Sequence, residues 1–220
     1  GSDVGLWSQY DASRIALLKR MYDTLTGLSP DLYVILEHFA DNSEERELAN
    51  YGMMFWGNLN YNYNEATMGY ASNSNFNWIS WQQRGWNQPH VMGYMESHDE
   101  ERLMYKNLQF GNGLGNYDIT DLSTALDRME LAGTFFFTIP GPKMMWQFGE
   151  VGYDVSIDDP CRVCNKPIRW NYYQESDRLH LYKVWKALIN LKTTYSTFST
   201  GNYSLNVGGI TKTINLDDPN

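Results

Sequence analysis

Short apolar runs alternate with helical segments along most of this chain, and this alternation constrains the fold more than any other feature. A strand–helix–strand order predicts parallel strands that are joined by crossover helices. We expect strands at residues 32–36, 53–56, 91–95 and 134–139. We expect helices at residues 11–25, 44–50, 122–132 and 177–192. The run at 32–36 is apolar throughout, which is typical of a strand buried on both faces.

Two segments depart from this alternation. Residues 59–89 form a long polar and aromatic stretch that contains Trp78, Trp81 and Trp86. The last segment, residues 202–220, alternates around a Gly-Gly pair in the manner of a β-hairpin. The first segment reads as loop, and the second as the start of a separate β element.

Composition and charge limit the classes of partner. The 220 residues are 42% apolar and 15% aromatic, which is enough for a substantial core. The formal net charge of −9 argues against nucleic acid and anionic membranes as partners, since both need a basic face. No apolar run approaches the length of a membrane span. Glu44, Glu45 and Glu47 form an acidic run that we interpret as the solvated face of a helix.

The two cysteines lie close together, at Cys161 and Cys164. One such pair cannot complete a tetrahedral zinc site, and no histidine is near it in the sequence. The flanking Asp-Pro and Lys-Pro sequences indicate a loop rather than the strand-to-helix turn of a redox motif. We therefore interpret the pair as a loop disulfide or as two free thiols, and expect no metal site.

Ionisable side chains directly follow two of the expected strands. Glu37 follows the first run, and His98 and Asp99 follow the third. The carboxyl ends of parallel strands share one rim, where the active sites of (β/α) barrels are built. Two carboxylates on one rim suit glycoside cleavage, which needs an acid for the leaving oxygen and negative charge beside an oxocarbenium-like transition state. Each residue also has a structural interpretation when it is taken alone. Glu37 could form a salt bridge at the end of a strand, and His98 could be a hydrogen-bonded structural residue. The aromatic residues of 59–89 could pack within a loop instead of stacking on sugar rings.

Three motifs, in order, resemble the α-amylase family of glycoside hydrolases (family 13). The sequence YVILEHF resembles the fifth-strand motif, which implies that Glu37 is the general acid/base. GYMESHDEER resembles the seventh-strand motif, which implies that His98 holds the sugar ring and that Asp99 stabilises the transition state. TIPGPKMMWQFGEVG resembles the eighth-strand segment. Further substrate-binding residues expected from the resemblance are Phe39, Trp56 and Arg102.

The resemblance implies an α/β fold: a partial TIM barrel, comprising strands 5–8 with their helices, followed by the start of a small β-domain. Residues 1–195 would form the second half of the (β/α)8 barrel, and residues 196–220 the beginning of a truncated C-terminal β-sandwich-type domain. The family's nucleophilic Asp, in a Gly-x-Arg-x-Asp motif, has no match before Glu37. Asp3 and Asp11 are the only candidates, and neither ends an apolar strand. We therefore expect a fragment of a retaining α-glucan hydrolase that cleaves α-1,4 bonds in starch or maltooligosaccharides, and that is inactive alone.

Two other functions remain open: a non-catalytic glucan-binding protein, and a transglycosylase or branching enzyme of the same superfamily. An α-glucan or oligosaccharide is the expected ligand in these cases. A third alternative, an unrelated α/β barrel enzyme, would place Glu37 and Asp99 on opposite ends of the sheet. A half barrel leaves two strand edges unpaired, so we expect self-association of half barrels. No cofactor is expected in this fragment, and Ca2+ only in the full-length parent. The sequence leaves the compartment open, and the resemblance is compatible with a secreted, periplasmic or cell-surface bacterial parent.

Overall fold

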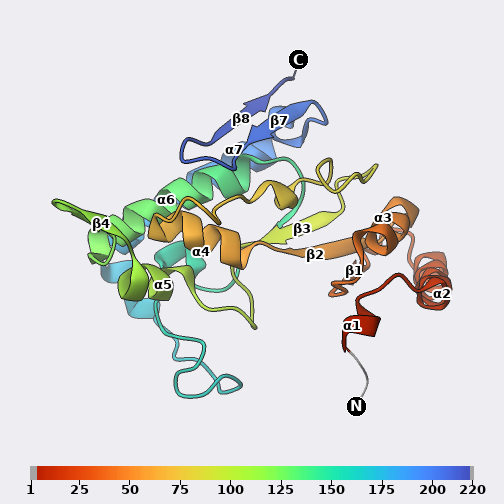
Figure 1. Cartoon of the computed structure of the whole chain (residues 1–220), viewed down its shortest axis with the longest axis horizontal. Coiled ribbons are helices and arrows are strands. Elements are labelled where there is room, and N and C mark those ends of the chain that lie inside the picture. Colours follow the sequence, from red (N-terminus) through yellow and green to blue (C-terminus); the bar gives the residue numbers. More distant parts are fainter. Residues whose placement is uncertain (1–3, 219–220) are drawn as a thin grey trace.

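The computed structural model describes residues 4–218, and a four-stranded parallel sheet lies at its centre (Figure 1). In spatial order the strands are β1 (Ile35–Leu36), β2 (Met54–Asn58), β3 (Val91–Tyr94) and β6 (Lys143–Met144). β2 and β3 share four register pairs, whereas β1 and β6 each contribute two. The expected sheet of four parallel strands is confirmed, with β1 and β6 at its edges.

Helices and short 3-10 turns form most of the remaining structure. The α-helices are α1 (Val4–Trp7), α2 (Ala12–Leu28), α3 (Asn42–Tyr51), α4 (Asn60–Met68), α5 (Leu103–Phe110), α6 (Leu122–Thr138) and α7 (Ser176–Thr194). The 3-10 turns are η1 (Asn77–Ile79), η2 (Gly149–Val151), η3 (Trp170–Gln174) and η4 (Ser196–Ser199). All four expected helices are confirmed, as α2, α3, the first part of α6, and α7. The helices α4, inside the stretch read as loop, and α5 were not assigned from the sequence.

One face of the sheet is covered and the other is open. α2 and α3 pack on the covered face, where Phe55 and Val91 are buried (Figure 1). On the opposite face Ile35, Met54 and Met92 line a groove of about 770 Å³. The expectation that the strand at 32–36 is buried on both faces is wrong, because nothing among the described residues covers the Ile35 side, and Ile35 is 41% exposed.

The expected strand at 134–139 is wrong: these residues form the end of α6 and the turn after it. Ala125, Met129, Ala132 and Phe136 recur at helical spacing and are buried in one core with Trp185 of α7. That spacing outweighs the β preference of the three consecutive phenylalanines. The fourth strand is instead β6, which begins after the Pro-Gly-Pro turn that follows α6.

The expected C-terminal hairpin is confirmed as β7 (Tyr203–Asn206) and β8 (Thr213–Leu216), which pair antiparallel. Residues 219–220 of that segment lie outside the described residues. Val207 at the turn is buried in the core of the helices, and the Tyr203 hydroxyl lies 2.7 Å from Ser80 Oγ. A second small hairpin joins β4 (Gly113–Leu114) to β5 (Tyr117–Asp118). The domain boundary at 195/196 stays a prediction.

The acidic run of α3 is not a solvated face. Glu44 and Glu45 are buried, and each pairs with an arginine from outside the helix, whereas Glu47 is partly exposed. Burial of a carboxylate is tolerated only when it is paired and hydrogen-bonded, and partners distant in sequence make that possible here. Within residues 4–218, none of the helices has the length and apolar character needed to cross a membrane.

Candidate active site

Glu37, His98 and Asp99 meet at the carboxyl rim of the sheet. Glu37 follows the edge strand β1, whereas His98 and Asp99 follow β3, on the other side of β2. One ligand atom of each residue, a carboxylate oxygen or a ring nitrogen, lies within 4.8 Å of those of the other two. His98 Nε2 is 3.6 Å from Asp99 Oδ2. The structure therefore brings together the three residues that the strand ends place on one rim, and leaves all three open to solvent.

Aromatic rings stand beside His98. The ring centroid of Trp56, from β2, lies 5.8 Å from that of His98, and the centroid of Trp146 lies 6.2 Å away. Tyr94 packs edge-on against Trp56 at 5.4 Å. Burial raises the pKa of Tyr94, and the negative charges of Glu100 and Glu37 raise it further. Rings and carboxylates together give this rim a mixed apolar and acidic surface.

Hydrogen bonds hold the loop that carries His98 and Asp99. Ser97 Oγ donates to the Glu100 carboxylate and accepts the backbone N–H of Asp99 at 3.2 Å. The same carboxylate accepts from Asn58 Nδ2, at the end of β2, with a donor–acceptor distance of 2.5 Å. Glu100 thus fastens the β3 loop to the neighbouring strand.

Glu96 and Arg102 form a buried ion pair beneath the rim. Arg102 Nη2 lies 3.0 Å from Glu96 Oε2, and the two side chains are 6% and 5% exposed. Burial raises the pKa of Glu96, although the positive charge of Arg102 and the backbone N–H of Leu103 oppose that rise. Arg102 Nη2 also donates to the carbonyl of Gln147 at 2.8 Å. Its guanidinium therefore serves mainly to join the β3 loop to the segment after β6, and its expected contact with substrate stays a prediction.

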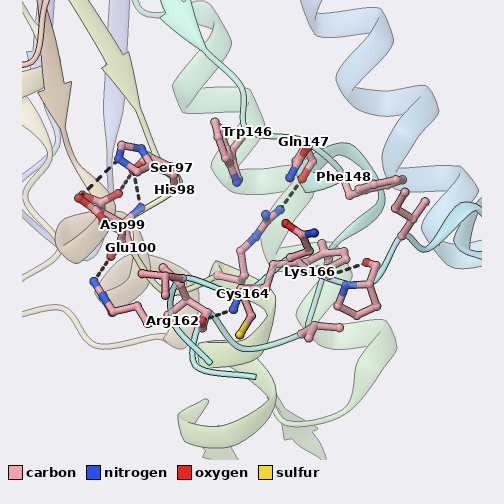
Figure 2. Close-up of a pocket in the computed structure, with 18 residues that line it drawn as sticks. Ser97, His98, Asp99, Glu100, Trp146, Gln147, Phe148, Arg162, Cys164 and Lys166 are labelled. Atoms are coloured by element: carbon pink, nitrogen blue, oxygen red, sulfur yellow. Dashed lines mark hydrogen bonds and ion pairs between the residues drawn. The ribbon is translucent and has the colours of Figure 1, made fainter. Parts of the chain in front are cut away.

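A pocket of about 410 Å³ opens beside His98 and Asp99 (Figure 2). The rim forms one wall, and Trp146 and Phe148 lie across from it. The remaining wall is a loop after η2 in which Cys161 and Cys164 form a disulfide, which decides between the two interpretations of the cysteines. Arg162, inside the disulfide ring, donates to the backbone carbonyl of Asp99. The cross-linked loop is thereby tied directly to the rim.

The other expected site residues lie near the rim with different surroundings. Trp56 reaches His98, as described above. Phe39, two residues after Glu37, is 47% exposed and has a φ of 51°, a left-handed conformation that is uncommon outside glycine. Its contact with substrate stays a prediction. Trp146 and Arg162 were not among the expected site residues: Trp146 follows the apolar run of the eighth-strand motif, whereas no local signal marks Arg162.

Glu37, His98 and Asp99 are also the one group among residues 4–218 in which three metal-ligating side chains could converge. An imidazole and two carboxylates suit a divalent transition metal. All three are exposed, however, and carboxylates converge on a glycoside-cleaving rim for a reason unrelated to metal. We assign no metal ion to them.

Several solved structures of sugar-cleaving enzymes resemble this chain. A cyclomaltodextrinase matches with a TM-score of 0.59 and 18% identity, over 91% of this chain and 32% of its own. An α-amylase from H. orenii matches with a TM-score of 0.58 and 13% identity, over 94% and 45%. A debranching enzyme from Nostoc punctiforme matches with a TM-score of 0.55 and 16% identity, over 90% and 42%. The chain has the fold of a partial α-amylase-family barrel.

The α-amylase-family barrel is matched in part only. The chain spans less than half the length of each of these three structures. No protein-family model matches the chain, and no curated protein sequence does. The expected partial TIM barrel is confirmed, while identities of 13–18% establish a shared fold and leave the activity to be argued from the site.

Proposed function

We propose that this chain carries the acid/base side of an α-glucan-cleaving site and has no useful hydrolase activity alone. The single observation that carries the proposal is the convergence of Glu37, His98 and Asp99 within 4.8 Å on one open rim. The named activities of the structural neighbours, cyclomaltodextrinase, α-amylase and debranching enzyme, support α-glucan as the ligand class.

Each residue has a distinct part in a retaining, two-step hydrolysis. Glu37 protonates the glycosidic oxygen while a nucleophilic carboxylate attacks the anomeric carbon and displaces the leaving group. Glu37 then takes a proton from the water that displaces this carboxylate. Asp99 places negative charge beside the oxocarbenium-like transition state. His98 donates a hydrogen bond to a ring hydroxyl, and Trp56 and Trp146 offer apolar faces next to it.

The proposed inactivity rests on the nucleophile, which the retaining route needs as a further carboxylate. Asp11 is engaged elsewhere: its Oδ1 accepts the backbone N–H and the hydroxyl of Ser13 at 2.8 and 2.6 Å, at the start of α2. Asp3 lies outside the described residues. Loss of one member of such a catalytic unit usually costs several powers of ten in rate.

Reducing-sugar release from soluble starch tests this, with the wild type run beside Glu37→Gln and the distant control Glu47→Gln. We expect no release above the blank from any of the three, together with saturable binding of maltoheptaose by the wild type. Release that disappears only in Glu37→Gln would refute the inactivity. Absence of maltoheptaose binding would refute the glucan site, and binding unaffected by Glu37→Gln without any release would favour a non-catalytic glucan-binding protein.

We further propose that the chain self-associates through the open face of its sheet. It exposes 11845 Å², whereas a compact monomer of 25.5 kDa is expected to expose about 10,400 Å². The excess of roughly 1,400 Å² is comparable to the area that one partner buries in a large obligate interface. The exposed Tyr33 and Ile35 lie on that face, beside the unpaired edge of β1.

Light scattering over a range of protein concentrations tests self-association. We expect a mass of two or more chains, which falls to one when Ile35→Lys places a charge on the open face. A wild-type mass that stays at one chain at the highest concentration would refute the proposal without affecting the assignment of the rim residues.

A further inference from the structure

Glu37 directly follows one of the two short edge strands of the sheet. β1 contributes two residues to the ladder, at an edge with one neighbour, and Glu37 is the first residue after it. Asp99, by contrast, follows β3, which pairs on both sides. Because the ladder fixes the chain only where it is paired, the position of Glu37 depends on what holds the residues that follow it.

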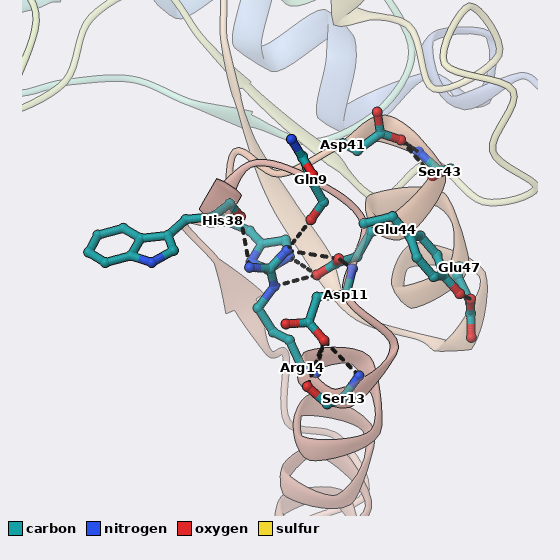
Figure 3. Close-up of polar contacts among 11 residues, drawn as sticks. Gln9, Asp11, Ser13, Arg14, His38, Asp41, Ser43, Glu44 and Glu47 are labelled. Atoms are coloured by element: carbon teal, nitrogen blue, oxygen red, sulfur yellow. Dashed lines mark hydrogen bonds and ion pairs between the residues drawn. The ribbon is translucent and has the colours of Figure 1, made fainter. Parts of the chain in front are cut away.

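Glu44 of α3 holds the first of these residues, His38 (Figure 3). Its fully buried carboxylate lies 2.7 Å from His38 Nε2 and accepts from Arg14 Nε at 2.6 Å and from the backbone N–H of Asp11 at 2.7 Å. Burial by itself would raise the pKa of Glu44, but the hydrogen bonds from Arg14, Asp11 and His38 outweigh it and lower that pKa. An ionised Glu44 therefore joins the residue after Glu37 to the start of α2.

Glu45 lies opposite the backbone of the next two residues. Burial raises the pKa of Glu45, and the charge of Arg84 and the backbone N–H groups of Ala40 and Phe39, which face the carboxylate, oppose that rise. Arg84 lies on the other side, with Nη1 3.3 Å from Glu45 Oε2, and both side chains are almost completely buried. Glu44 therefore contacts His38 directly, and Glu45, on the same helix, faces the backbone of the two residues that follow His38.

The φ of 51° at Phe39 indicates that contacts with the surrounding structure hold this segment in a backbone conformation that a bulky residue disfavours. A positive φ in a bulky residue costs conformational energy and persists only where the surroundings impose it. Such outliers gather at sites where geometry matters. Here the residue with the positive φ is two positions from Glu37 and directly follows His38, the residue that contacts Glu44.

We propose that Glu44 and Glu45 are positioning residues for Glu37, which hold its carboxylate opposite His98 and Asp99. They touch no reacting atom and act through residues 38–40. The inference rests on the proposed function, because only an acid/base at Glu37 makes its distance from Asp99 matter. Two helices can pack stably without buried carboxylates, because buried ion pairs add little to stability. A positioning role would explain why Glu44 and Glu45 are buried here.

Two variants test the proposal in the 220-residue chain. His38→Phe removes the contact with Glu44 but keeps a ring against Phe55, whose centroid lies 5.8 Å from that of His38. Glu45→Ala removes the second set of contacts. Glu47→Gln is the matched control, because Glu47 lies on the same helix and pairs with Lys19 of α2, away from residues 38–40. Urea unfolding first establishes which variants are folded, and His38→Phe carries the test if Glu45→Ala is not.

Two readouts follow the position of Glu37: the NMR cross-relaxation between its side chain and the His98 ring, and the dissociation constant of maltoheptaose. We expect the cross-relaxation to be lost in both test variants and kept in Glu47→Gln. We expect the dissociation constant to rise about tenfold in the test variants, the effect of losing one hydrogen bond to a charged group.

The outcomes separate the two proposals. Folded test variants that keep the cross-relaxation and bind maltoheptaose as the wild type does would overturn the positioning role. If the wild type binds no maltoheptaose, the proposed function fails, and the cross-relaxation alone decides whether Glu44 and Glu45 position Glu37. If Glu47→Gln loses the cross-relaxation and the maltoheptaose affinity to the same extent as the test variants, the site needs only the packing of α3 against α2. That result would also overturn the inference.

Discussion

Replacing Glu45 by glutamine is expected to make the protein more stable, relative to the wild type, as the pH rises. The Glu45 side chain is 6% exposed, and burial raises its pKa from an ordinary value of 4.5 to about 7, against the opposing charge of Arg84. Burial also lowers the pKa of Arg84, to about 10, so the arginine stays charged where Glu45 titrates. The wild type must therefore ionise a buried acid that resists ionisation, and the glutamine variant need not.

The size of the effect follows from proton linkage. Between pH 4.5 and about 7 the unfolded chain has lost the Glu45 proton and the folded chain retains it, so the free energy of unfolding falls by about 1.4 kcal/mol per pH unit. Over the whole window the fall is about 3 kcal/mol, and above it the penalty is complete and constant. Glutamine does not titrate, so the difference between variant and wild type should grow by this amount.

Urea unfolding followed by tryptophan fluorescence, repeated from about pH 4 to about pH 8, measures this difference. Glu47→Gln is the control with the opposite sign. The hydrogen bond from Lys19 lowers the pKa of Glu47, so its contribution is present at neutral pH and is lost as the pH falls through the acidic range. If the difference in free energy of unfolding between Glu45→Gln and the wild type does not change with pH, the reasoning is refuted. If the difference shrinks as the pH rises, the charge of Arg84 lowers the pKa of Glu45 by more than burial raises it.

Two further predictions concern packing and the cross-linked loop. Gly133→Ala should lower the free energy of unfolding, measured by urea unfolding, by about 1–3 kcal/mol, because the new methyl would lie 2.3 Å from Nε1 of the buried Trp185. Gly27→Ala should raise the same free energy by about 0.5–1 kcal/mol, because Gly27 lies in α2 with open space around it. Replacing Cys161 and Cys164 by serine should cost at most about 2 kcal/mol, since the disulfide closes a ring of few residues, and a larger loss would show that the loop supports the core.

Much of the fold could be predicted because its signals are local. The helices α2, α3 and α7 carry apolar residues at helical spacing, and short apolar runs mark three of the four strands. Glu37 and Asp99 could be placed together for a topological reason: parallel strands end on one rim, whatever the side chains do. The order of strands and helices along the chain is enough to predict this placement.

The rest depends on contacts between distant residues. The end of α6 contains three consecutive phenylalanines, which favour a strand locally, and only their packing against α7 makes them helical. Glu44 reads as a surface acid because its partner Arg14 lies thirty residues earlier. Arg162 reaches Asp99 across 63 positions, from a loop that carries no strand or helix signal. The spacing of residues along the sequence does not predict contacts between partners that are this far apart.

The disulfide between Cys161 and Cys164 makes the shape of the pocket depend on where the chain is made. Such bonds form and persist in oxidising surroundings, and cytosolic thiol systems keep cysteines reduced. The same sequence produced in a reducing cytosol would carry two thiols and a loop free to move away from Asp99, which Arg162 otherwise holds from within the ring. The proposed affinity for glucan should therefore be measured on oxidised and reduced preparations separately, because the loop beside Asp99 differs between them.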